Sequence, residues 1–110
     1  MPERDPEISA GELDKRVTLL QPVYNAPEDE IPGWNPVADV WASIAPNYAM
    51  EVNEAGRTVA VVSAPIVIRF RSDIDHRWRV QWGTHLYEIE GIVDVAARGA
   101  QLQLNCKEVL

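Results

Sequence analysis

The 110-residue sequence is poor in the residues that carry most covalent and metal chemistry. It has one cysteine, Cys106, and two histidines, His76 and His85, that lie nine positions apart. A single cysteine excludes an intrachain disulfide. No Cys-x-x-Cys, His-x-x-x-His, aspartate-rich metal spacing, glycine-rich phosphate loop or Gly-x-Ser-x-Gly is present. The sequence therefore predicts no catalytic residue, no metal site and no cofactor, and we expect the protein not to be an enzyme.

Long hydrophobic runs are also missing. No apolar stretch approaches the roughly 20 residues that a membrane-spanning helix needs. The start, Met1 to Pro6, has neither the basic end nor the apolar stretch of a secretory signal. We therefore expect no membrane partner, and we expect synthesis and assembly in the cytoplasm.

Positive charge is in short supply. Ten lysines and arginines face 17 aspartates and glutamates, which gives a net charge of -7 and a pI of about 4.7. Tight wrapping of duplex DNA requires lysines and arginines that neutralise phosphates, so this chain is a poor candidate for it. An acidic surface suits either plain solubility or a passage through which DNA moves without sticking. The charge alone does not choose between them.

What the chain does contain is a series of short runs with β-strand periodicity. The hydrophobic fraction of 46% suffices for one core at this length. We expect residues 1–12 to be a tail that orders only against a partner, followed by a single domain over 13–110. Strands are predicted over 16–21, 37–45, 58–71 with a bend at Pro65, 78–81, 85–92 and 100–108. The glycine of Trp82-Gly83-Thr84 predicts a hairpin turn.

Two segments do not follow this pattern. Residues 22–36 contain four prolines and Gly33, which predicts a long loop. Residues 47–57 predict a short helix that Asn47 caps and Gly56 ends. Five or six strands with at most one helix indicate an all-β barrel or sandwich, because closure removes exposed edges. Cys106 lies on the apolar side of the last predicted strand, so we expect a packed thiol and not a nucleophile.

Two charged features are candidate sites. One is the acidic triplet Glu28-Asp29-Glu30 in the centre of the proline-rich loop, which is otherwise a solvated loop tip. The other is a group of four arginines within eleven positions: Arg69, Arg71, Arg77 and Arg79. Arginines form forked bonds to carboxylates and phosphates, so this group would grip an acidic neighbour or a DNA backbone. The alternative is ordinary exposed strand charge.

Seven segments, in order, resemble the phage head-tail joining (head-closure) family. The family opens with A-G-x-L-x-x-R-I/V and continues with a tryptophan, a short strand, W-A-x-I/V-x-P and a glutamate. The corresponding residues here are Ala10-Gly11-Glu12-Leu13, Arg16-Val17-Thr18-Leu19, Trp34, Val37-Ala38-Asp39-Val40, Trp41-Ala42-Ser43-Ile44-Ala45-Pro46 and Glu51. An I-x-I-R-F/Y-R strand and an Arg-Val element are similar to Ile66-Val67-Ile68-Arg69-Phe70-Arg71 and Arg79-Val80. The closing segments resemble Tyr87-Glu88-Ile89-Glu90-Gly91-Ile92-Val93-Asp94 and Leu102-Gln103-Leu104-Asn105-Cys106-Lys107-Glu108.

The resemblance implies a small SH3-like β-barrel with a long inserted loop. It implies a homo-oligomeric ring of six or twelve copies, with portal and adaptor proteins above and tail proteins below. Such a stopper ring retains or gates packaged double-stranded DNA, which passes without sequence-specific binding. The implied location is a virion or a phage-like particle, such as a gene transfer agent, assembled in the bacterial host cytoplasm.

By the same resemblance, Glu28, Asp29 and Glu30 would line the channel as a gating loop. The tryptophan Trp34 and the four arginines would contact neighbouring subunits or an adjacent ring. Trp41 is either a further interface anchor or barrel core, and we expect core. Two alternatives remain: a tail-terminator or adaptor ring, and a small OB/SH3-like nucleic-acid-binding module. The second would use exposed aromatics among basic residues, for which Arg77-Trp78-Arg79 and Trp82 come nearest, although the net charge argues against it.

Overall fold

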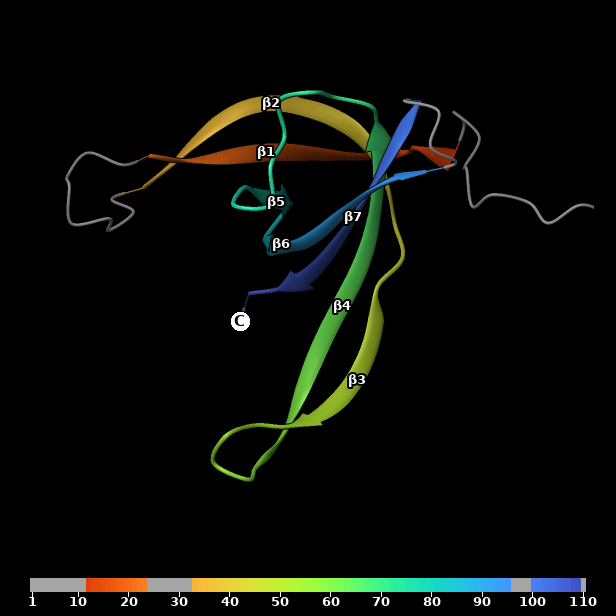
Figure 1. Ribbon diagram of the computed structural model, residues 1–110. Helices are drawn as coiled ribbons and strands as arrows, with labels where there is room; N and C mark the ends of the chain where they lie inside the picture. Colours follow the sequence, from red (N-terminus) through yellow and green to blue (C-terminus); the bar gives the residue numbers. More distant parts are fainter. Residues whose placement is uncertain (1–11, 24–32, 96–99, 110) are drawn as a thin grey trace, which may run out of the picture.

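The computed structural model describes residues 12–23, 33–95 and 100–109 and consists of antiparallel β-strands (Figure 1). The strands are β1 (Lys15–Val23), β2 (Gly33–Ile44), β3 (Asn47–Val52), β4 (Thr58–Arg69), β5 (Arg79–Trp82), β6 (His85–Val95) and β7 (Gln101–Glu108). No α-helix occurs among the described residues. Within the same ranges, therefore, no helix is long and apolar enough to cross a membrane.

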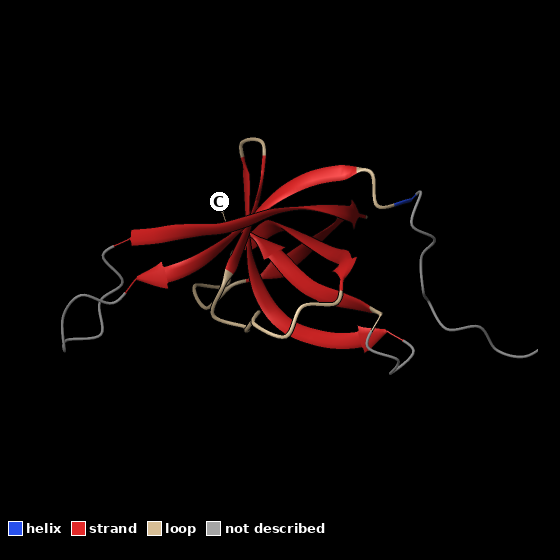
Figure 2. Cartoon of the chain, turned by 90° about the horizontal axis from the view of Figure 1, so that it is seen from above, coloured by secondary structure: helices blue, strands red, loops and turns tan. Residues whose placement is uncertain are grey.

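Six of the seven strands close into a barrel (Figure 2). The order is β2-β1-β5-β6-β7-β4, and β4 pairs again with β2, while β3 pairs with β4 alone. Register shifts interrupt β1 between Leu19 and Leu20 and β6 between Ile89 and Gly91. Such bulges bend strands locally and help a small sheet to curve. The predicted all-β small barrel is confirmed, with one strand more than the five or six expected.

The barrel interior is filled by the inward-facing residues of all six barrel strands. The fully buried members are Val17, Leu19, Ala42, Ala64, Ile66, Ile68, Val80, Tyr87, Leu104 and Cys106. In β4 and β7 the core residues come from alternate positions, as the period of two predicts. Cys106 is buried, so the expected packed thiol is confirmed, and burial raises the pKa of the thiol to about 12.

The loop predicted over residues 22–36 is shorter in the structure, because β1 continues to Val23 and β2 begins at Gly33. Pro22 lies in β1 opposite Trp34, and Pro36 lies in β2 opposite Leu20. At both prolines the strand has one hydrogen-bonded neighbour, because β1 pairs with β5 only from Thr18 to Leu20 and β2 pairs with β4 only from Ala42 to Ile44. A proline is tolerated there because its missing N–H can face the open side. Residues 24–32 and the predicted tail, 1–11, lie outside the described residues.

The short helix predicted after Asn47 is wrong, because these residues form β3 and pair with β4 over six positions. A helix of about five residues gains few internal hydrogen bonds, whereas in the hairpin β3 pairs with β4 at all six of its positions. Gly56 has a positive φ of 78° and lies in the hairpin turn. The side-chain oxygen of Asn53 accepts hydrogen bonds from the backbone N–H groups of Ala55 and Arg57, both at 3.0 Å. The turn is thereby braced from within.

The hairpin turn predicted at Trp82-Gly83-Thr84 is confirmed. Gly83 and Thr84 connect β5 to β6, and Gly83 has a positive φ of 59°, a region that glycine enters without steric cost. The turn brings His85 beside Glu108 of β7, with Nδ1 and Oε2 2.8 Å apart. His85 is exposed, as expected of a surface residue next to a turn.

Candidate functional site

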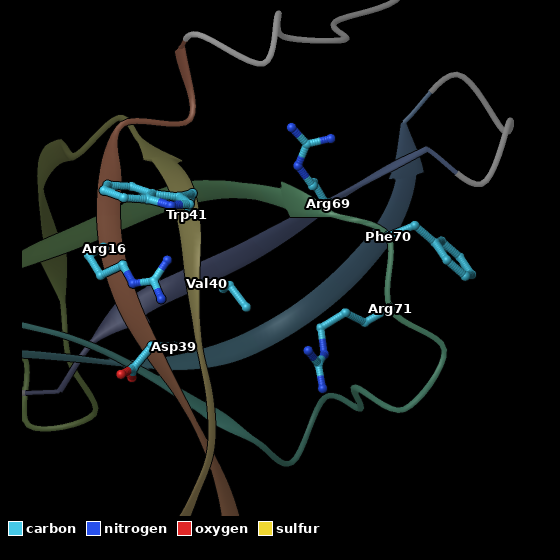
Figure 3. Close-up of a pocket in the computed structure, with 7 residues that line it drawn as sticks. All are labelled: Arg16, Asp39, Val40, Trp41, Arg69, Phe70 and Arg71. Atoms are coloured by element: carbon cyan, nitrogen blue, oxygen red, sulfur yellow. The ribbon is translucent and has the colours of Figure 1, made fainter.

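A groove opens on the barrel wall where β2 and β4 part. The two strands pair only between Ala42–Ile44 and Ile66–Ile68, and beyond this point they diverge. The resulting space, about 290 Å³, is bordered by residues 39–41 of β2, residues 69–71 at the end of β4, and Arg16 of β1. Figure 3 shows Val40 pointing into the gap, with Trp41 on one side and Arg69 on the other. We refer to it as the β2/β4 groove.

Trp41 belongs to this groove and not to the core. Its side chain is 52% exposed, so the expectation that it fills the barrel is wrong. The reason is the strand alternation: Ala42 takes the inward position on β2 and is fully buried, which turns Trp41 outward. Arg16, directly opposite Trp41 on β1, places its guanidinium carbon 5.0 Å from the ring centre (Figure 3). This cation–π contact holds the indole flat against the outer wall.

The four arginines predicted as one site are divided between two grooves. Arg69 and Arg71 border the β2/β4 groove. Arg77 and Arg79 border a second groove of about 280 Å³ together with Trp34 and Glu88. The division arises because the chain leaves the wall after Arg69 and rejoins it at Arg79. The four arginines are close in sequence, but they do not form one surface.

Two of these arginines are already paired within the intervening loop. Arg71 lies 2.8 Å from Asp73, and Arg77 lies 2.8 Å from Asp75. The hydrogen bond from Arg77 lowers the pKa of Asp75 to about 2, and that from Arg71 lowers the pKa of Asp73. These short-range pairs offset part of the charge that the arginine group would offer to DNA. They weigh against the nucleic-acid-binding alternative.

The second groove is built around Trp34 and Arg79. The guanidinium carbon of Arg79 lies 4.4 Å from the centre of the Trp34 ring. A nitrogen of the same guanidinium is 4.0 Å from a carboxylate oxygen of Glu88, its opposite residue on β6. Trp34 and Arg79 are both partly exposed. The residues expected to contact neighbours are therefore at the surface, where such contacts are possible.

A third surface was not anticipated from the sequence. The hairpin of β3 and the first part of β4 extends away from the barrel (Figure 1). On one of its faces Tyr48, Met50 and Val52 are 77%, 65% and 70% exposed. The alternation of these three residues with Asn47, Ala49 and Glu51 is the only signal in the sequence, and it extends over just six positions. A row of large exposed apolar side chains on a projecting element is typical of a contact surface.

The acidic triplet Glu28, Asp29 and Glu30 lies outside the described residues. The described residues on either side of this segment, Val23 of β1 and Gly33 of β2, are directly opposite each other. Among the residues that the structure describes, no group of three or more histidine, cysteine or acidic side chains could hold a metal ion.

Comparisons with known proteins agree with this architecture. The sequence model of the phage head completion protein family matches residues 8–109. A chain from the virion of a native gene transfer agent particle superposes with a TM-score of 0.71 at 20% identity, over 87% of this chain and 94% of that one. The solution structure of protein SF1141 from Shigella flexneri 2a superposes with a TM-score of 0.60 at 24% identity, over 92% and 96%. At these identities both likenesses describe the fold alone. No curated protein matches.

Proposed function

This chain belongs to the phage head completion protein family, and from that membership we propose that it closes the filled head as one subunit of a ring between the portal-adaptor and the tail. The role of the family is structural, in completing the head of the virion. The observation that carries the proposal is the extent of the match, which spans residues 8–109 and so includes the whole described barrel.

The surface of the barrel supports assembly into a ring. Its two arginine-bordered grooves are open to solvent. Both contain an indole ring under a guanidinium, and tryptophan and arginine are the residues most enriched at the centres of protein interfaces. We assign Trp34, Arg69, Arg71, Arg77 and Arg79 to contacts with neighbouring subunits or an adjacent ring.

The acidic triplet is the proposed gate. Glu28, Asp29 and Glu30 lie in the segment that joins the ends of β1 and β2. In a ring of six or twelve copies, three acidic residues from each subunit would surround the channel with like charge. Such a collar repels phosphates from the wall, so DNA is retained by obstruction and released without binding to the protein. The segment from 24 to 32 contains two prolines, Pro27 and Pro32, and prolines make a segment stiffer than a Gly/Ser loop, which suits an obstruction.

Particles assembled without this protein test the proposal. Heads that package DNA, then leak it and remain without tails, are the expected result, and adding the purified protein back should restore both retention and tail joining. Full, stable heads that join tails normally would refute head closure. Full heads that only fail to join tails would assign the protein to an adaptor or tail-terminator position instead.

A further inference from the structure

The β1–β2 hairpin is joined firmly within itself. Its two strands pair along the whole length of β1, at nine positions. On the outer side of the barrel the Thr18 hydroxyl donates to the Asp39 carboxylate at 2.6 Å, and the guanidinium of Arg16 lies over the ring of Trp41. Each of these cross-strand contacts links β1 to β2. The two strands are therefore held together as one unit.

Two short seams join this hairpin to the other strands, β3 to β7, which we call the five-strand block. In the first seam β1 pairs with β5 only from Thr18 to Leu20, and in the second β2 pairs with β4 only from Ala42 to Ile44. Within the block, β6 pairs with β7 at eight positions and β4 pairs with β7 at seven. Figure 1 shows β1 and β2 lying together along one side of the barrel. The two seams divide the barrel into the hairpin and the block.

The described chain passes from the hairpin to the block at a single link, between Ile44 and Asn47. Pro46 in this link has no N–H to donate. The N–H of Ala45 donates to the carbonyl of Pro65 at 3.3 Å, which is longer than a usual backbone hydrogen bond. Hinges occur at a few residues of this kind, at the ends of secondary-structure elements. The link is therefore placed as a hinge between the two parts.

The hairpin contributes the smaller share of the core. Of the thirteen residues in the buried apolar cluster it supplies three, Val17, Leu19 and Ala42, and the rest of the chain supplies the others. Beside the second seam the strands already diverge at the β2/β4 groove (Figure 3). Separation along the seams would expose less apolar surface than unfolding of the whole barrel. Its free-energy cost would therefore be lower than that of global unfolding.

We propose that the β1–β2 hairpin separates from the five-strand block along both seams as one unit, with the link at Ala45–Pro46 as its hinge. The contact of Arg79 with Trp34, 4.4 Å from guanidinium carbon to ring centre, bridges the two parts and fastens them from outside. The open form is a minor population of the free protein, because opening exposes part of the core.

This inference deepens the proposed function and rests on it for the role of the opening in the particle. A closure protein passes from retaining DNA to releasing it, and separation of the hairpin is the movement that the barrel provides for that change. The opening itself is a property of the isolated barrel, so it is tested first on the purified protein.

Native-state hydrogen exchange tests the opening. The N–H groups of residues 18–20 and 42–44 that bond across the seams should exchange about tenfold or more faster than those of residues 102–106 in β7. Both seams should show the same opening equilibrium. Seam residues that exchange as slowly as β7 would overturn the proposal, because the barrel would then open only by global unfolding. Different opening equilibria for the two seams would also overturn it, since the hairpin would not move as one unit.

A disulfide across the first seam provides the variant that blocks the movement. Thr18 of β1 and Gln81 of β5 are directly opposite each other and neither is buried, so Thr18→Cys together with Gln81→Cys can be oxidised to close this seam. The matched control is Gln21→Cys with Asn35→Cys, which are opposite each other within the hairpin and exposed. The native thiol of Cys106 is buried and does not compete for pairing.

Oxidation of the seam variant should slow exchange at residues 42–44, in the other seam, by about tenfold relative to residues 102–106, and reduction should reverse the effect. The control disulfide should leave that ratio unchanged. Equal slowing at both places would mean that the disulfide stabilises the whole fold. Slowing confined to residues 18–20 would mean that the seams open separately. Either result would refute the proposal.

Particles that carry the same two variants test the role in closure. With the seam disulfide oxidised, DNA ejection should be about tenfold slower than after reduction, because the open form is no longer accessible. The control disulfide should leave the rate unchanged. Ejection at the wild-type rate from oxidised seam-variant particles would refute the use of the opening for release. If these tests fail while particles without the protein still leak DNA, only the inferred movement is refuted and head closure stands.

Discussion

Arg79 of β5 and Trp34 of β2 meet across the outer side of β1. The guanidinium carbon lies 4.4 Å from the centre of the indole ring, although the two strands pair with opposite edges of β1. The contact lies beside Pro22 and Pro36, where backbone hydrogen bonding is interrupted. It therefore fastens the part of β1 and β2 that the sheet holds least firmly.

A double-mutant cycle measures this fastening. We expect Trp34→Leu and Arg79→Ala to be coupled by about 0.5–1 kcal/mol, the usual range for a partly exposed cation–π contact. Urea unfolding of wild type, both single variants and the double variant gives the coupling. Arg69→Ala, at an exposed position, is the matched control and should be additive with Trp34→Leu. Additivity of the Trp34 and Arg79 changes would show that the stacking contributes nothing to stability.

Trp41 of β2 faces outward and Ile66 of β4 faces the core. We therefore expect truncation of the two side chains to change the free energy of unfolding by different amounts. Trp41→Ala should change the free energy of unfolding by less than about 1 kcal/mol, because the indole is half exposed. Ile66→Ala, at a fully buried position, should cost about 2–5 kcal/mol. Chemical unfolding of both variants checks the comparison. A loss for Trp41→Ala as large as that for Ile66→Ala would return Trp41 to the core.

Cys106 should be unreactive until the protein unfolds. Burial raises the pKa of its thiol to about 12, so at neutral pH almost none is present as thiolate, the reactive form. A chromogenic disulfide reagent should label less than one hundredth as fast in buffer as in denaturant. Labelling at equal rates in the two conditions would contradict the burial of β7.

The Asp75–Arg77 pair should contribute to stability at neutral pH and lose that contribution in acid. The pKa of Asp75 is about 2 when folded, below its ordinary value of 3.8, so the folded state favours the ionised carboxylate. The contribution is present above pH 4 and disappears as the pH falls through 2. Because the pair is solvent-exposed, we expect less than about 1 kcal/mol.

Asp75→Asn is the matched variant for this pH effect, since the amide oxygen can still accept the backbone N–H of Arg77. Urea midpoints of wild type and variant should converge between pH 4 and pH 2. A constant difference across that range would assign the effect to something other than ionisation.

The acidic triplet should influence DNA release without affecting the barrel. Replacing Glu28, Asp29 and Glu30 together by lysine should slow ejection and make its rate strongly salt-dependent, because phosphates would then bind the collar. Replacing the two glutamates by glutamine and the aspartate by asparagine should give an ejection rate without that salt dependence. Ejection rates from particles at several salt concentrations provide the measurement. Identical rates for all three proteins would remove the triplet from the channel.

The sequence predicted the barrel well because its signal is local. Alternation places Ile66, Ile68, Leu104 and Cys106 on one side of their strands, and all four are buried. Prolines were less informative, because Pro22 and Pro36 indicate a loop or an edge strand equally well. The choice between a loop and an edge strand depends on whether a second strand pairs at these positions. That is a property of the whole sheet and cannot be read from the local sequence.

The candidate surfaces were predicted less well because they depend on distant partners. Trp41 faces outward because Ala42 occupies the core position, and the four arginines are separated by the path of the loop that contains Asp73 and Asp75. The β3 hairpin was missed because its six residues are too few to show a clear period without the opposite strand. Ring contacts and the gating role of the acidic triplet remain predictions.

β4 is continuous from the hairpin turn to the groove, with Pro65 inside it next to the point where its neighbour changes from β3 to β2. The hairpin and the strand pair that closes the barrel therefore share one backbone, with no flexible linker between them. A force applied at the hairpin turn would reach the barrel wall through β4 itself.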